Sequence, residues 1–202
     1  MRVAVALVVL GVTLVAAIPL SDGPSVTCIF DIDHTLTRAK SVSASYCNVS
    51  SLEPAVGTAH PGVYARQAIA QCLQKGYHVA VATAEPKWWV EKNMDFLHWV
   101  GNGTFNATFF DSPAFQHGNL VPVFNKTLEL DNVLNYYKTS PECTIFYDDS
   151  AKNGAVATTM KVNWQEASES CEGDQICEKA CGISQSEFEQ GQATLQKICP
   201  SA

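Results

Sequence analysis

The sequence predicts an α/β fold: a mostly parallel sheet of five strands covered by helices, followed by a short disulfide-tied helical tail. Two observations carry this prediction. Apolar runs of strand length alternate with segments whose apolar residues recur at helical spacing, which is typical of parallel sheets covered on both faces. Behind them, residues 169–202 hold four of the eight cysteines among many acidic and amide side chains.

The first predicted strand, residues 26–30, is an apolar run short enough to be buried in a sheet. A polar, serine-rich stretch follows at residues 38–59, and we expect it to form a loop or flap, called the flap below. Pro61 then opens a helix with apolar residues at helical spacing, and Gly76 ends it. Residues 77–82 are the second strand.

The middle of the chain is expected to add two helices and a strand. Pro86 suits the first turn of a helix that runs to about Trp99. Residues 107–110 are expected to form a short third strand that ends at Asp111. A second helix opens at Lys126, where apolar residues again recur at helical spacing.

The last part of the chain is expected to contain two more strands and a final helix. Residues 143–147 are the fourth strand and residues 160–164 the fifth. Ser184 and Glu187 have the spacing of a capping box, which predicts a helix over residues 185–198.

Composition and charge indicate one domain without a nucleic-acid partner. With 202 residues, 47% of them hydrophobic, the chain can build one sizeable core. A formal charge of −7 argues against nucleic acid and anionic membranes, because both favour basic patches.

The N-terminus has the features of a secretory signal. Residues 1–17 combine a single arginine, an apolar run and small residues at its end, which predicts a signal peptide; an uncleaved anchor is the alternative. The resulting division is a signal peptide at 1–17, a linker at 18–24, a domain at 25–168 and an extension at 169–202. We expect a protein that is secreted or resides in the lumen of the secretory pathway, with no stable membrane anchor after signal cleavage.

Cysteines and glycosylation motifs fit the same route. The even number of cysteines favours disulfides, and we expect Cys47 to pair with Cys72 and the four tail cysteines to pair among themselves. Four N-x-[ST] motifs predict acceptor sites for N-linked glycans. Their asparagines are Asn48, Asn102, Asn106 and Asn125.

Polar side chains stand where three of the predicted strands end. Asp31 and Asp33 follow the first strand, Thr83 ends the second, and Asp148 and Asp149 end the fourth. In a parallel sheet these ends gather along one edge, so the side chains are expected to share one site. Two carboxylates one strand step apart repel each other unless a cation lies between them, which indicates a hard divalent metal.

This set of residues suits phosphoryl transfer. Asp31 can attack phosphorus to form an aspartyl-phosphate. Asp33 can protonate the leaving alkoxide and later activate water. Thr83, together with Lys126 at the start of its helix, can bind phosphate oxygens.

The motifs resemble those of the haloacid dehalogenase (HAD) superfamily, most of whose members are magnesium-dependent phosphatases. Four motifs match in order and on the expected elements. The D-x-D-x-[TV] motif matches residues 31–35, the strand-end Thr or Ser matches Thr83, the motif lysine matches Lys126, and the acidic pair matches Asp148-Asp149.

The resemblance implies a fold, a cofactor and a substrate class. It implies a Rossmann-like three-layer sandwich of the small-cap or capless branch, because no segment between the motifs has room for a large cap. The implied cofactor is Mg²⁺, and its expected ligands are Asp31, Asp33, Asp148 and Asp149. The implied substrate is a phosphorylated small molecule or a phosphoprotein, hydrolysed through an aspartyl-phosphate. The alternative is a non-catalytic secreted binding or effector protein on the same scaffold.

Two positions depart from the family pattern. His34 follows Asp33, where small residues are common. Glu85 follows Thr83 by two residues, where the family often has a glycine or a basic residue. A carboxylate beside a phosphate site would repel the substrate unless it points away.

Overall fold

The protein folds around one parallel sheet. The computed structural model describes residues 25–115, 125–167 and 179–199, so the expected signal peptide and two of the tail cysteines lie outside the described residues. Among the described residues the strands run in the order β2-β1-β3-β4. Their bounds are β1 Thr27–Phe30, β2 His78–Val81, β3 Thr144–Asp148 and β4 Asn163–Glu166.

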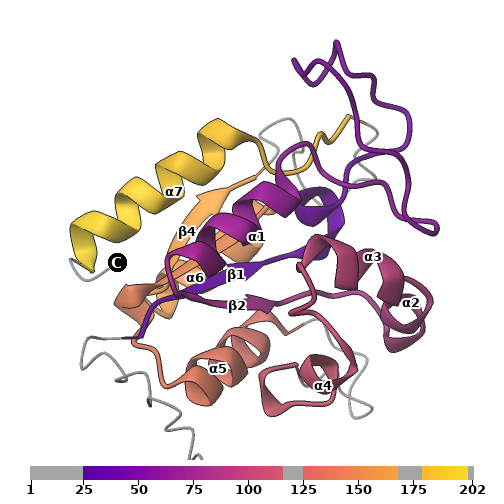
Figure 1. Cartoon of the computed structure of the whole chain (residues 1–202). Coiled ribbons are helices and arrows are strands. Elements are labelled where there is room, and N and C mark those ends of the chain that lie inside the picture. Colours follow the sequence, from indigo (N-terminus) through magenta and orange to yellow (C-terminus); the bar gives the residue numbers. More distant parts are fainter. Residues whose placement is uncertain (1–24, 116–124, 168–178, 200–202) are drawn as a thin grey trace, which may run out of the picture.

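Helices cover both faces of this sheet (Figure 1). Their bounds are α1 Ala65–Gln74, α2 Lys87–Lys92, α3 Met94–Val100, α4 Ala107–Phe110, α5 Lys126–Tyr137, α6 Ala151–Thr159 and α7 Gln185–Ile198. In the view of Figure 1, α1 and α7 lie above the sheet and α5 lies below it. The expected α/β class with a parallel sheet is therefore confirmed.

Close packing of glycines shows which face α6 and α7 cover. A Cβ atom on Gly191 of α7 would lie 2.6 Å from the ring of Tyr147, and one on Gly154 of α6 would lie 2.3 Å from the ring of Trp164. Trp164 is the register partner of Phe146, the strand neighbour of Tyr147. Because neighbouring side chains on a strand point to opposite faces, α6 and α7 lie on opposite sides of the sheet.

The expected third strand is wrong. Residues 107–110 form α4, because the Asn106 side chain accepts a hydrogen bond from the Phe109 backbone N–H at 3.2 Å and caps a helical turn. The described sheet consequently has four strands and not five. The last strand also begins later than expected, at Asn163, because α6 runs to Thr159 and Lys161 turns the chain with a φ of 62°.

Two helix predictions have different outcomes. The helix expected from Pro86 to about Trp99 is divided into α2 and α3 at the buried Asn93, whose side chain donates to Trp89 O at 3.0 Å and accepts from Thr58 Oγ1 at 2.8 Å. The helix expected over residues 185–198 is confirmed as α7, with the capping box of Ser184 and Glu187 in place.

The predicted cysteine pairing is also wrong. The disulfides among the described residues are Cys28–Cys72, Cys47–Cys181 and Cys143–Cys199. Cys181 and Cys199 pair with cysteines of residues 25–168 because α7 packs on the sheet, which places both ends of the helix beside the domain. Three disulfides support an oxidising, extracellular-type environment. None of the helices in the described part of the chain has the length and apolar character needed to cross a bilayer.

Candidate functional site

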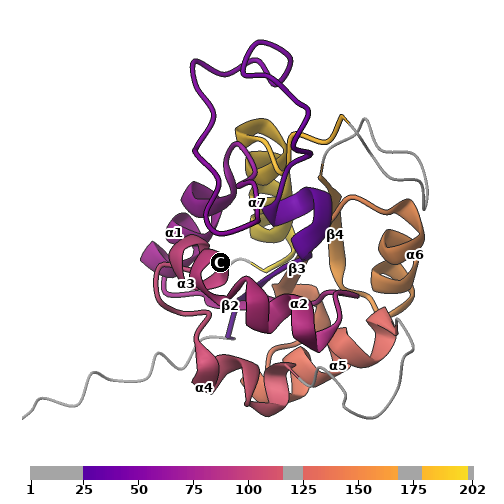
Figure 2. The same cartoon turned by 90° about the vertical axis from the view of Figure 1, so that its right-hand side faces the viewer.

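The candidate site lies at the edge where the strands end, which is turned toward the viewer in Figure 2. Asp31 follows β1, and its backbone N–H donates to Tyr147 O on β3 at 2.9 Å. A short helical turn, η1 (Ile32–Leu36), comes next, and its His34 has a left-handed φ of 57°. This conformation redirects the chain directly after Asp33, so the two aspartates stand at the start of a sharp turn.

Lys126 brings separate parts of the site together. Its Nζ atom lies 2.5 Å from Asp31 Oδ1, 2.5 Å from Ala82 O and 3.5 Å from Asp148 Oδ2. The Lys126 side chain is only 6% exposed. The ends of β1, β2 and β3 therefore meet at one buried ammonium group, as the sequence predicts for Asp31, Lys126 and Asp148.

Asp148 is held by the protein itself. This fully buried carboxylate accepts hydrogen bonds at Oδ1 from Ser150 N at 2.8 Å and from the Asn153 side chain at 3.0 Å. The Asn153 amide also reaches Oδ2 at 3.1 Å, on the oxygen that faces Lys126. Both oxygens are thus engaged, and Asp148 is fixed in orientation.

The cluster holds more negative charge than one lysine neutralises. Burial raises the pKa of Asp31 against the opposing effect of Lys126, and Asp148 and Asp33 raise it further. Burial, together with Asp148, raises the pKa of Asp149 to about 7. Burial alone would lower the pKa of Lys126, but Asp31 and Asp148 raise it, so the lysine stays charged.

Glu85 lies beside Asp33. Burial, and then a hydrogen bond with the Asp33 side chain, raise the pKa of Glu85 to about 8. The Glu85 backbone N–H donates to Oγ1 of the buried Thr83 at 3.1 Å, directly after β2. Glu85, an acid that is unexpected beside a phosphate site, is therefore paired with Asp33, the predicted acid–base residue.

One acidic neighbour of the site was missed at the sequence level. Glu129 Oε2 lies 3.6 Å from Lys126 Nζ, across one turn of α5. The signal was present as an acidic residue three positions after the predicted motif lysine, on the same helix face.

The donor chemistry of the site fits a hard divalent cation. Asp31, Asp33 and Asp149 offer carboxylate oxygens, the ligands that such cations prefer, and the surplus of negative charge favours binding. Across the described ranges, however, no three His, Cys, Asp or Glu side chains are arranged as a preformed metal-binding group. The fit therefore rests on ligand type and charge, and the expected ligand set of Asp31, Asp33, Asp148 and Asp149 stays a prediction.

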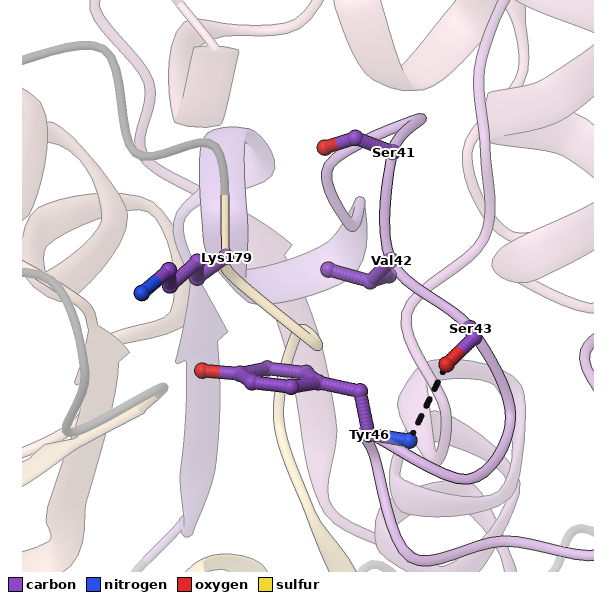
Figure 3. Close-up of a pocket in the computed structure, with 5 residues that line it drawn as sticks. All are labelled: Ser41, Val42, Ser43, Tyr46 and Lys179. Atoms are coloured by element: carbon purple, nitrogen blue, oxygen red, sulfur yellow. Dashed lines mark hydrogen bonds between the residues drawn. The ribbon is translucent and has the colours of Figure 1, made fainter.

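A separate hollow lies between the flap and the tail (Figure 3). It has a volume of about 330 Å³. Its lining residues are Ser41, Val42, Ser43, Tyr46 and Lys179. None of the expected site residues lines it, so it is distinct from the carboxylate cluster.

Comparison with known proteins supports the fold. No family model matches the chain, and no curated protein matches it. An uncharacterized protein from Listeria monocytogenes serotype 4b has a similar structure, with a TM-score of 0.51 and 14% identity over 86% of this chain and 99% of that chain. A hypothetical protein from Xanthomonas campestris reaches a TM-score of 0.44 and 17% identity over 91% of this chain and 88% of that chain. At 14% identity the first likeness shows a shared fold alone.

Proposed function

We propose that the protein is a magnesium-dependent phosphatase that hydrolyses phosphomonoesters through an aspartyl-phosphate. The observation that carries this proposal is the position of Lys126, within 2.5 Å of Asp31 and 3.5 Å of Asp148. These residues come from three motifs far apart in the sequence, and they make one charged cluster at the strand ends. We propose further that the chain is a Rossmann-like member of the HAD superfamily, of its small-cap or capless branch.

The first half of the reaction belongs to Asp31 and Asp33. Lys126 holds Oδ1 of Asp31, which leaves Oδ2 to attack phosphorus. A bond forms between Asp31 and phosphorus while the bond from phosphorus to the ester oxygen breaks. Asp33, in its protonated form, gives its proton to the departing alkoxide.

The second half returns both aspartates to their starting states. Asp33, now a carboxylate, takes a proton from a water molecule whose oxygen attacks phosphorus. The bond between Asp31 and phosphorus breaks, and inorganic phosphate leaves. Thr83 and Lys126 bind the phosphate oxygens as charge moves onto them.

The expected magnesium ligands are the aspartates of the cluster. When bound, Mg²⁺ neutralises phosphate charge and keeps Asp31 ionised. Asn153 contributes indirectly, because its amide donates to both oxygens of Asp148 and orients this carboxylate.

Turnover of a panel of phosphomonoesters by the purified mature protein tests the proposal. We expect hydrolysis in Mg²⁺, loss of activity in excess chelator and recovery when Mg²⁺ is restored, with Asp31→Asn inactive throughout. Undiminished turnover in chelator would contradict the magnesium assignment. A folded, Mg²⁺-loaded protein that turns over no member of the panel would instead favour the non-catalytic alternative.

A further inference from the structure

We propose that Asn48 and Asn102 carry N-linked glycans and that Asn106 does not. All three asparagines stand in N-x-[ST] motifs, but the structure presents their side chains differently. The glycan is attached to Nδ2 of asparagine and adds a bulky, hydrated group, so the folded protein accepts it only where this atom reaches solvent.

Asn48 lies in a tight turn of the flap. Its backbone N–H donates to Ser45 O at 3.3 Å, and Val49 N donates to Ala44 O at 3.0 Å. Asn48 itself has a left-handed φ of 52° and is exposed. Within the described part of the chain its side chain has no hydrogen-bond partner. The Cys47–Cys181 disulfide next to it ties this turn to the tail, and the Asn48 side chain is left exposed.

Asn102 has the same features in the turn after α3. It is exposed, and its φ is 50°. Its backbone N–H donates to Trp99 O at 3.3 Å, while its side chain is unpaired among the described residues. A sugar on Nδ2 would extend into solvent without breaking a contact.

Asn106 lies four positions further on and is already used by the fold. Its Nδ2 donates to Gly103 O at 2.9 Å, and its Oδ1 accepts from Phe109 N at 3.2 Å as the cap of α4. The residue is half-buried. A sugar on Nδ2 would crowd the turn that the amide closes, so the folded protein carries Asn106 unmodified.

The proposal leaves out Asn125, the asparagine of the fourth motif. Residues 116–124, directly before it, lie outside the described ranges. The three disulfides support the oxidising compartment in which such glycans are added.

The experiment expresses the full chain in a eukaryotic secretory host and compares variants that remove one motif each. Ser50→Ala and Thr104→Ala should each increase mobility on a gel by one glycan, and Thr108→Ala, the matched control for Asn106, should leave it unchanged. Enzymatic deglycosylation of the wild-type protein in ¹⁸O-labelled water, followed by fragment mass spectrometry, reads the same sites without a variant. Label at Asn48 and Asn102 and none at Asn106 is the expected result. Label at Asn106, or its absence at Asn48 or Asn102, would overturn the proposal.

Discussion

Lys126 is the residue on which the site depends most directly. A lysine that is 6% exposed stays charged only because carboxylates surround it, and here Asp31 and Asp148 face the same Nζ atom. The two acids depend on the lysine in turn, because they are buried as well. Without Lys126, neither Asp31 nor Asp148 would keep a cationic partner among the described ion pairs.

Replacing Lys126 by methionine tests this dependence. We expect loss of phosphatase activity and a decrease of about 3–5 kcal/mol in the free energy of unfolding, because a buried charge pair is broken from one side. Urea unfolding in chelator measures the second effect, with the exposed Lys197→Met as the matched control. A Lys126→Met protein as stable as this control would show that the cluster carries little uncompensated charge.

Asp149 predicts a pH dependence of stability. Its pKa is about 7 in the folded protein against an ordinary value of 3.8. Between these values the folded protein binds a proton that the unfolded chain has lost, so the stability of the metal-free protein falls as pH rises through this window. Asp149→Asn removes this loss. The difference in free energy of unfolding between the variant and the wild type should therefore grow from about pH 4 to about pH 7 and stay constant above pH 7. We expect this difference to reach about 1–2 kcal/mol, because solvent screens a partly exposed group.

Urea unfolding in chelator at several pH values checks this prediction. A difference between Asp149→Asn and the wild type that stays the same at every pH would mean that Asp149 titrates normally.

At the scale of single elements, α7 supports the strand that carries Asp148. Gly191 of α7 lies against the Tyr147 ring, and the Tyr147 hydroxyl donates to Phe188 O at 3.2 Å. Gln192, one residue further on, donates to the same hydroxyl at 3.1 Å. The helix thus fixes the residue directly before Asp148.

Gly191→Ala should loosen this contact. The added methyl group would sit 2.6 Å from the ring, and such overpacking costs about 1–3 kcal/mol, more than the helix propensity gained. Thermal unfolding should show the loss, while the exposed Gln190→Ala on the same helix should not. Equal stability of the two variants would show that α7 shifts freely on the sheet.

Elements with strong local signals were predictable, and those decided by tertiary contacts were not. The capping box of Ser184 and Glu187 acts within one turn, so the start of α7 could be predicted closely from the sequence. Residues 107–110 have side chains that suit a strand, but pairing depends on a neighbour in space, and the Asn106 cap favours a helix instead.

The candidate site was predictable to a similar degree. Strand ends of a parallel sheet must gather, so the meeting of Asp31 and Asp148 follows from the order of elements. Lys126 begins α5 and was expected at the site from its match to the motif lysine. The contact of Glu85 with Asp33 does not follow, because the direction of side chains in a loop depends on the final backbone. The pairings of Cys181 and Cys199 do not follow either, because they depend on where α7 docks.

At the scale of the whole molecule, the tail is built into the framework of the site. Ile183 N donates to Thr35 O in η1 at 2.8 Å, and Ala39 N at the base of the flap donates to Ala180 O at 2.8 Å. Gly182 allows this close crossing, since a Cβ atom there would lie 2.5 Å from the Cα atom of Gly62. Residues 180–183 therefore run between the flap and the turn that follows Asp31.

The Cys47–Cys181 disulfide should hold this arrangement. Cys47→Ala with Cys181→Ala removes a link between positions 134 residues apart, and we expect the free energy of unfolding to fall by about 2–4 kcal/mol. Denaturant unfolding measures the loss, and peptide mapping of the unreduced wild type identifies the pair. A map that joins Cys181 to another cysteine, or an unchanged unfolding midpoint, would contradict the role of this bridge.

The proposed mechanism makes Asp31 the nucleophile and Asp33 the acid–base residue. Asp33→Asn should still be phosphorylated by an activated aryl phosphate, whose leaving group needs little acid assistance, but it lacks the base that activates water. Intact mass spectrometry after mixing in Mg²⁺ should therefore show one added phosphoryl group on Asp33→Asn. Asp31→Asn and the double variant should show none, because an amide is a poor nucleophile. Labelling of Asp31→Asn as readily as Asp33→Asn would place the nucleophile elsewhere and contradict the account.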